Sequence, residues 1–425
     1  MTAVAERPTE QEPRRLTRWQ RALIYFLVGF AIVSLVEQIT GITELSSSGT
    51  FGATLRLAMP ILMAALGGLY SERSGIVNIG LEGMMIAGTW FSAWGAWQFG
   101  PWRGVLIGIA GGAIFGLLHA VATVTFNVDH IVSGVAINIL AAGVMRFLSV
   151  VTYEAGSGGG ATQSPTVPGI PTVDIPFLAG GTLFGWETPD LFGWLERTGW
   201  FLLSDIAALG KGLTGRISWL TLIGLALVPL TWFLLWRTAW GLRLRSCGEN
   251  PWAAESLGVP VYRMKYYAVV ISGGLAGLGG VFLVLVQANI YREGQTGGRG
   301  FIGLATMLFG NYNPFGALGG ATLFGFADAL RLRDPEAVLS LFLVVSIGMV
   351  LLAGRSAIAG KVRPAAWQGA VAIAALAVFM FVGRIPNEFI FITPYVVTLV
   401  VLSAASQRLR MPAADGVRYR KGEAT

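Results

Sequence analysis

The sequence predicts an all-α protein that crosses a membrane many times. Three observations carry this prediction: 54% of the residues are hydrophobic, only 12% are charged, and the mean hydropathy is +0.64. Soluble domains have about 25% charged residues, whereas apolar runs of roughly 20 residues are typical of transmembrane helices. The 58 glycines lie mostly inside the apolar runs, which is typical of closely packed membrane helices. We therefore expect about ten to twelve membrane helices, including short broken ones.

The N-terminal part predicts a cytoplasmic tail followed by five crossings. Residues 1–21 include Arg14, Arg15 and Arg18, and basic residues beside a first span favour the cytoplasmic side. No small-residue cleavage site follows the first apolar run, so we expect that run to remain as a helix. The first membrane helices, within residues 22–151, are predicted at 22–36, 51–69, 76–97, 104–126 and 131–151.

Residues 152–218 form a long non-membrane insertion, which the count of crossings places on the extracytoplasmic side. Its second half, 189–209, predicts a helix rich in aromatic and apolar residues. These residues are Trp194, Trp200, Phe201 and Leu202. Such side chains favour a membrane interface. A contact surface for an external partner, a lid and a loose insertion stay open as alternatives.

A sixth crossing, at 219–236, returns the chain to the cytoplasm, where a polar island separates two hydrophobic blocks. Residues 237–265 form this cytoplasmic loop, and the island occupies 247–259. Its polar character excludes burial in lipid, and its basic flanks favour the cytoplasmic side. The flanking residues are Arg243, Arg245, Arg263 and Lys265. A short helix here would dock onto a cytoplasmic partner, which indicates a driven transporter and not a passive pore.

Residues 266–404 predict the second set of membrane helices. An apolar block at 300–330 is interrupted by Gly310-Asn311-Tyr312-Asn313-Pro314. We expect two short or broken helices there, which are tolerated at membrane depth where protein or a water-filled cavity covers the break. Basic residues place the C-terminal tail, 405–425, in the cytoplasm. The remaining spans are predicted at 266–287, 337–353, 366–382 and 389–404.

Several classes of function are excluded by the residue pattern. Gly210-Lys211 and Gly360-Lys361 lack the upstream glycine and following Ser or Thr of a phosphate-binding loop, so ATP would be hydrolysed on another subunit. His119 and His130 do not have a metal-ligand spacing, and the single Cys247 excludes a disulfide or a multi-cysteine site. We expect no cofactor, no metal and no catalytic cluster, so the protein is not predicted to be an enzyme. The net charge of +7 reflects basic loop edges and termini and not nucleic-acid binding.

Two further patterns predict structure and not chemistry. His130 beside Asp129 indicates a solvated turn between two helices. Glycines repeated every four residues form flat helix faces that favour close helix packing. These glycines are Gly108, Gly112 and Gly116 in one span, and Gly273 and Gly277 in another.

Polar residues inside the apolar spans are the candidates for a transport pathway. Asn78 and Glu82 are expected to lie one helical turn apart on one face. An ionisable group in a membrane segment is costly and indicates a pathway or a buried partner. The alternative is that Glu82 caps or hydrogen-bonds a neighbouring broken helix, which the adjacent glycines favour. Arg146 would either line the pathway or extend to the membrane interface. The complete candidate set is Asn78, Glu82, Asn138, Gln287 and Asn289.

Three segments resemble bacterial ABC-importer permeases for nucleosides, within a larger group that includes ribose and branched-chain amino acid permeases. They are residues 71–85, 248–259 and 411–423. The pattern Gly-Glu-Asn-x-x-Ala-Ala-x-x-x-Gly is shared across the broad group. The run Ser-Glu-Arg-Ser-Gly-Ile-Val-Asn-Ile-Gly-Leu-Glu-Gly-Met is narrower and indicates nucleosides. The tail differs from the family pattern at Asp415 and Arg418, where leucine and proline are expected.

The resemblance implies a permease subunit of an ATP-driven nucleoside importer in the bacterial plasma membrane, with both termini cytoplasmic. It implies two cytoplasmic ATPase subunits, a second permease subunit (identical or different), and an extracytoplasmic substrate-binding lipoprotein. A more distant likeness of 256–259 and 300–304 to the membrane subunit of the vitamin B12 importer implies the type II importer fold. The implied ATPase-coupling residues are Gly248, Glu249, Asn250, Ala253, Ala254, Ser256, Leu257, Gly258 and Val259.

Two alternatives remain open at this point. The same machine could import a simple sugar such as ribose, or a branched-chain amino acid. A stand-alone secondary transporter or channel is the alternative from another class. It would need a coupling-ion site of buried carboxylates or paired half-helices, for which Glu82 is the one candidate.

Overall fold

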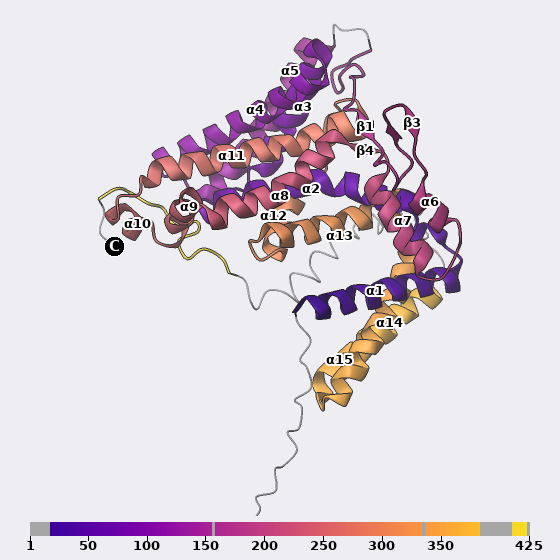
Figure 1. Cartoon of the computed structure of the whole chain (residues 1–425). Coiled ribbons are helices and arrows are strands. Elements are labelled where there is room, and N and C mark those ends of the chain that lie inside the picture. Colours follow the sequence, from indigo (N-terminus) through magenta and orange to yellow (C-terminus); the bar gives the residue numbers. More distant parts are fainter. Residues whose placement is uncertain (1–17, 155–157, 334–336, 383–409, 423–425) are drawn as a thin grey trace, which may run out of the picture.

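The computed structural model describes residues 18–154, 158–333, 337–382 and 410–422. In these residues the chain forms a bundle of long helices with a small extension of strands and short helices at one end (Figure 1). Seven of the described helical segments are long and apolar enough to cross a membrane, so the protein is an all-α polytopic membrane protein. They are Thr43–Arg73, Pro101–Thr125, His130–Tyr153, Trp219–Arg237, Val261–Ala288, Ala337–Ile358 and Val362–Phe381.

The two ends of the bundle carry different structures (Figure 1). The end with α9 (Ala239–Glu249), α10 (Pro251–Ser256) and residues 410–422 is called the coupling end below. The opposite end, called the insertion end, carries residues 158–218. In that extension β1 (Thr172–Val173) pairs antiparallel with β4 (Ile217–Ser218), and β2 (Thr182–Leu183) with β3 (Trp186–Glu187).

The helix α2 (Ser48–Arg73) lies at the centre of the bundle. In the most apolar 18-residue stretch of this segment, 83% of the residues are buried inside the protein. The helix packs against α11, α12 and α13. Most long helices of a polytopic protein expose one face to lipid, so this degree of burial marks α2 as the helix around which the others are arranged. The three neighbours are α11 (Val261–Phe282), α12 (Arg299–Phe309) and α13 (Pro314–Arg333).

Glycine faces join α11 to α3 (Leu81–Phe99) and α4 (Pro101–Ala120). A Cβ atom placed on Gly277 would lie 2.8 Å from the carbonyl oxygen of Gly108 and 2.9 Å from the Cα of Gly112. One placed on Gly116 would lie 2.7 Å from the carbonyl oxygen of Val269. These helices therefore touch through their backbones, which confirms the packing role predicted for the two glycine patterns.

Three helices form an arm beside the main body: α1 (Arg18–Thr40), α14 (Ala337–Ile358) and α15 (Val362–Phe381) (Figure 1). A small apolar cluster that includes Val36, Leu330 and Val338 attaches the arm to the insertion end. In the most apolar 18-residue stretches of α14 and α15, only 28% and 11% of the residues are buried inside the protein. Their apolar surfaces are therefore free to face lipid or another membrane subunit.

Most predicted spans agree with the structure. The predicted 104–126 and 131–151 correspond to Pro101–Thr125 and His130–Tyr153. The predicted break in 300–330 is confirmed, since α12 ends at Phe309 and α13 begins at Pro314. The predicted span 389–404 lies outside the described residues.

Three local predictions are wrong. The span expected at 76–97 corresponds to α3, which is not among the seven candidate spans. This helix begins only at Leu81, because the preceding residues form a turn in which Gly75 has φ +85°. The helix expected at 189–209 is two helices, α6 (Leu191–Glu196) and α7 (Leu203–Thr214). His130 was expected in a solvated turn, but its side chain is buried and it is the first residue of α5 (His130–Tyr153).

Candidate functional site

The carboxylate of Glu82 caps a helix. Its two oxygens accept hydrogen bonds from the backbone nitrogens of Gly298, at 3.0 Å, and Gly300, at 2.7 Å. These two glycines flank the first residue of α12, whose N-terminal N–H groups have no partner inside the helix. A negative charge at this position also interacts favourably with the helix dipole. The interpretation of Glu82 as the cap of a neighbouring broken helix is therefore confirmed by the geometry.

Substituting Glu82 by alanine is expected to lower the free energy of unfolding by about 2 kcal/mol, because the buried N–H of Gly300 and the partly buried N–H of Gly298 lose their carboxylate acceptor. Thermal unfolding of the detergent-purified protein measures this. Glu82→Gln keeps one carbonyl acceptor and is expected to lose less. Unchanged uptake by a normally expressed Glu82→Gln variant would rule out an essential charged role in transport.

Asn78 and Asn138 hold the turn that leads into α3. The Asn78 amide donates to Ser272 Oγ at 2.9 Å and accepts from the backbone nitrogen of Gly80 at 3.1 Å. Asn138 accepts from the backbone nitrogen of Gly83 at 2.7 Å and donates to the carbonyl of Ile79 at 3.1 Å. Because Asn78 precedes α3, the expectation that Asn78 and Glu82 share a helical face is wrong. The three side chains are nevertheless gathered around the start of α3.

Gln287 and Asn289 lie elsewhere, beyond the last α-helical turn of α11. The Gln287 amide donates to the carbonyl oxygen of Arg56 at 2.7 Å. Asn289 has left-handed backbone geometry, φ +54°, and its carbonyl accepts from the backbone nitrogen of Val167 at 2.9 Å. The five pathway candidates thus form two groups, and no hydrogen bond among the described residues joins one group to the other.

Arg56 was missed by the sequence reasoning, although it is a charged residue inside the predicted span 51–69. Its side chain is exposed on α2, and its guanidinium makes no hydrogen bond or ion pair in the described part of the chain. Arg216 and Arg333 are its charged neighbours. An arginine within a membrane helix normally faces protein or a water-filled space, since burial in lipid is costly. Arg146, by comparison, pairs with Glu293.

The coupling loop folds into two short helices with a defined end. The Asn250 side chain caps α10 by accepting from the backbone nitrogen of Ala253 at 2.9 Å. Gly258 ends the turn with φ +82°, and its nitrogen donates to the carbonyl of Glu255 at 2.8 Å. Leu257 next to it is 84% exposed. An apolar side chain this exposed beside a helix end is available to a partner.

The nine residues expected to couple to the ATPase fall into two sets. Gly248 and Ala254 are buried, and Val259 is partly buried, so these three position the loop. The others are exposed: Glu249, Asn250, Ala253, Ser256, Leu257 and Gly258. Beside this loop, burial raises the pKa of the Cys247 thiol to about 11 and that of the Asp415 carboxyl to about 7.

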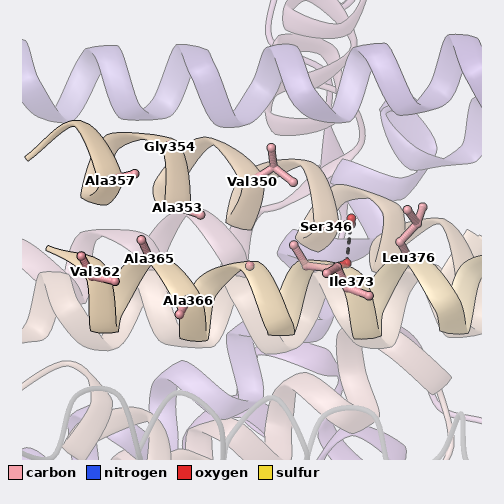
Figure 2. Close-up of a pocket in the computed structure, with 12 residues that line it drawn as sticks. Ser346, Val350, Ala353, Gly354, Ala357, Val362, Ala365, Ala366, Ile373 and Leu376 are labelled. Carbon is pink, nitrogen blue, oxygen red and sulfur yellow. Dashed lines mark hydrogen bonds between the residues drawn. The ribbon is translucent and has the colours of Figure 1, made fainter. Parts of the chain in front are cut away.

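A groove of about 740 Å³ between α14 and α15 is a less suitable site for a polar cargo (Figure 2). Alanine, glycine and branched apolar residues line it. The hydroxyl of Ser346 in the groove is already used, because it donates to the carbonyl of Ala372 at 3.0 Å. Among the described residues, no group of three His, Cys, Asp or Glu side chains is placed to hold a metal ion.

Residues 50–354 match the family described as branched-chain amino acid transport system / permease component. The chain belongs to this family. Residues 50–354 of the permease include all five pathway candidates and the whole loop 237–265, whereas all of α15 and the C-terminal tail follow them. No solved structure matches this permease.

Three curated relatives cover most of the permease. It is 35% identical to the guanosine ABC transporter permease protein NupQ of Bacillus subtilis, over 87% of this chain and 96% of the relative. It is 33% identical to the nucleoside ABC transporter permease protein NupC of Lactococcus lactis, over 86% and 94%. It is 30% identical to the putative glucose ABC transporter permease protein TsgC13 of Haloferax volcanii, over 87% and 96%.

Proposed function

We propose that this permease is the membrane subunit of an ATP-driven importer of nucleosides. The observation that carries the proposal is its 35% identity to a guanosine permease across 87% of the chain. The narrow sequence pattern at 71–84, which indicated nucleosides, supports the same cargo. In the structure this segment runs from the end of α2 into the start of α3 and contains the turn that Asn78 and Asn138 hold in place.

The proposed machine needs other subunits. ATP is hydrolysed on two separate ATPase subunits, since the sequence lacks a phosphate-binding loop, and this permease is not an enzyme. A second permease subunit and an extracytoplasmic substrate-binding lipoprotein complete it. The basic flanks of α10 favour the cytoplasmic side for the coupling end, and we propose that both termini also lie in the cytoplasm of a bacterial cell, with the insertion end outside. We also propose that the permease has about ten to twelve membrane helices in a type II importer arrangement.

The exposed residues in and beside α10 are proposed to contact the ATPase. ATP binding to the ATPase would then shift the permease between inward-open and outward-open states. We propose that six residues line the transport pathway. They are Asn78, Glu82, Asn138, Gln287, Asn289 and Arg56. Arg56 lies about 12 Å along α2 from its first residue at the insertion end, where an entering substrate would pass.

Uptake by an Arg56→Gln variant is expected to fall about tenfold, because a charged donor to the substrate's oxygens is lost. Initial rates of guanosine uptake in cells measure this. Arg56→Lys keeps the charge and is expected to lose less. Arg103→Gln is the matched control, because Arg103 is an exposed arginine at the start of α4. Wild-type uptake by Arg56→Gln would remove Arg56 from the pathway.

A sugar is the second candidate cargo, and the 30% identity to a putative glucose permease favours it. Uptake of radiolabelled nucleosides, ribose, glucose and leucine by cells with and without the operon separates the cargoes. Nucleoside uptake that needs both the operon and ATP supports the proposal, whereas uptake of a sugar or leucine alone contradicts the nucleoside assignment. Failure to co-purify with an ATPase would instead favour a stand-alone transporter.

A further inference from the structure

The C-terminal tail, residues 410–422, crosses the coupling end (Figure 1). Hydrogen bonds join it to several other segments of the protein. The backbone nitrogen of Ala414 donates to the carbonyl of Gly248 at 2.8 Å, and that of Gly416 to the carbonyl of Gly75 at 3.3 Å. At the start of the tail, the nitrogen of Arg410 donates to Asn311 Oδ1 at 2.7 Å. The tail therefore contacts α9, the α2–α3 turn and the α12–α13 turn at the same time.

Tyr419 anchors the tail to α10. Its side chain is only 4% exposed, and its hydroxyl donates to Glu255 Oε2 at 2.6 Å. Its ring lies 5.7 Å from the ring of Trp252 and 5.5 Å from that of Tyr262, measured between centroids. Trp252 and Glu255 are both residues of α10, so Tyr419 holds this helix from the side.

A helix as short as α10 needs such support. It has six residues, of which Pro251 and Ala254 are buried, and a helix of this length is not stable by itself in water. These two residues attach it to the rest of the protein, Ala254 within the apolar cluster that also contains Tyr419. The Tyr419 contacts add a second point of attachment, on the α10 residues Trp252 and Glu255.

The other side of the tail reaches the turn that starts α3. The carbonyl oxygen of Ala414 lies 3.0 Å from where a Cβ of Gly75 would be, so the tail packs tightly against this turn. The same turn leads to Asn78 and to Glu82, whose carboxylate caps α12. A displacement of α10 that moves the tail is therefore passed to a turn connected with three membrane helices.

We propose that the C-terminal tail is a positioning element of energy coupling, in which Tyr419 holds α10 in place and the segment around Ala414 transmits its displacement to the α2–α3 turn. This rests on the proposed function, because it assumes that an ATPase moves α10. Tyr419 acts through α10 and touches no substrate.

The test uses the assembled transporter, with its ATPase subunits and partner permease, in proteoliposomes with the binding protein and guanosine. For Tyr419→Ala, the number of ATP molecules hydrolysed per guanosine imported is expected to rise about tenfold, since both ring contacts and the hydroxyl bond are lost. Tyr419→Phe keeps the rings and is expected to change this ratio less than about threefold. Val417→Ala, an exposed position of the same tail, is the control and should leave the ratio unchanged.

A wild-type ratio for Tyr419→Ala would overturn the inference. A second measurement is independent of cargo: amide hydrogen exchange in α10 of the full complex, expected to quicken about tenfold in Tyr419→Ala and to stay unchanged in Val417→Ala. Unchanged exchange in Tyr419→Ala would also overturn it, as would unchanged exchange in Tyr419→Leu, which likewise lacks the ring and the hydroxyl, if the alanine variant does not accumulate. If the wild-type complex moves no guanosine while Tyr419→Ala still loosens α10, the proposed cargo fails and the positioning role of the tail stands.

Discussion

Replacing Gly277 by leucine is expected to prevent accumulation of folded permease. Gly277 on α11 lies against the backbones of Gly108 and Gly112 on α4, so any side chain would force the two helices apart. Overpacking inside a close-packed interior costs about 1–3 kcal/mol when side chains can adjust. Backbone atoms cannot adjust in the same way, so we expect a cost of about 3 kcal/mol or more. Because close packing is a main force between membrane helices, the bundle should come apart.

Fluorescence-detected size-exclusion chromatography of the detergent-solubilised protein measures this outcome. Gly143→Leu is the matched control, since Gly143 is an exposed helical glycine on α5 and no atom lies within 4 Å of an added Cβ there. The control should elute as a single sharp peak. A Gly277→Leu variant that is equally monodisperse, with unchanged thermal stability, would show that the glycine contact is not required.

Replacing Gly258 by tryptophan is expected to abolish uptake while the protein still inserts into the membrane. No atom lies within 4 Å of an added Cβ at Gly258, so the ring would project outward from the end of α10, beside exposed Leu257. In the proposed machine this is where the ATPase docks. We expect ATPase binding to weaken about 100-fold, as when a central contact of an interface is blocked. The positive φ of +82° adds strain of about 1 kcal/mol or more.

Gly360→Trp controls for strain and exposure. Gly360 lies between α14 and α15, has φ +69°, and likewise has no atom within 4 Å of an added Cβ. This variant should keep both uptake and ATPase co-purification. Normal uptake by Gly258→Trp would contradict the coupling assignment, and loss of uptake in both variants would show that strain, and not docking, is responsible.

Hydropathy predicted the long helices well, because a bilayer requires apolar segments of defined length with their backbone groups paired internally. Thus the predicted 219–236 corresponds to Trp219–Arg237, and the break at Asn311 and Tyr312 agrees with their left-handed backbone. Hydropathy did not predict that α3 begins at Leu81. The turn before it is held by the Asn78 side chain and its partner Ser272, which lies 194 residues away in the chain.

For the pathway candidates too, the local sequence did not predict contacts between distant segments. An ionisable residue in an apolar run indicates a buried partner, and for Glu82 this was correct. The partner cannot be identified from the apolar run, because Gly298 and Gly300 are more than 200 residues away and only folding brings them to the carboxylate. Arg56 was overlooked for the opposite reason. Its candidacy rests on the absence of a hydrogen-bond or ion-pair partner for its guanidinium among the described residues, and that can be judged only when its neighbours are placed.

From its sequence alone this chain could be identified as a multi-spanning membrane protein with a polar loop between two hydrophobic blocks, and its motifs indicated a nucleoside permease. These properties follow from local composition and spacing, which the bilayer and the family pattern constrain directly. Only the tertiary structure decided that the glycine faces of α4 and α11 meet, that Glu82 caps α12, and that the C-terminal tail joins α10 to the α2–α3 turn. Each of these is a contact between distant segments, and its energy arises only when folding brings the two segments together.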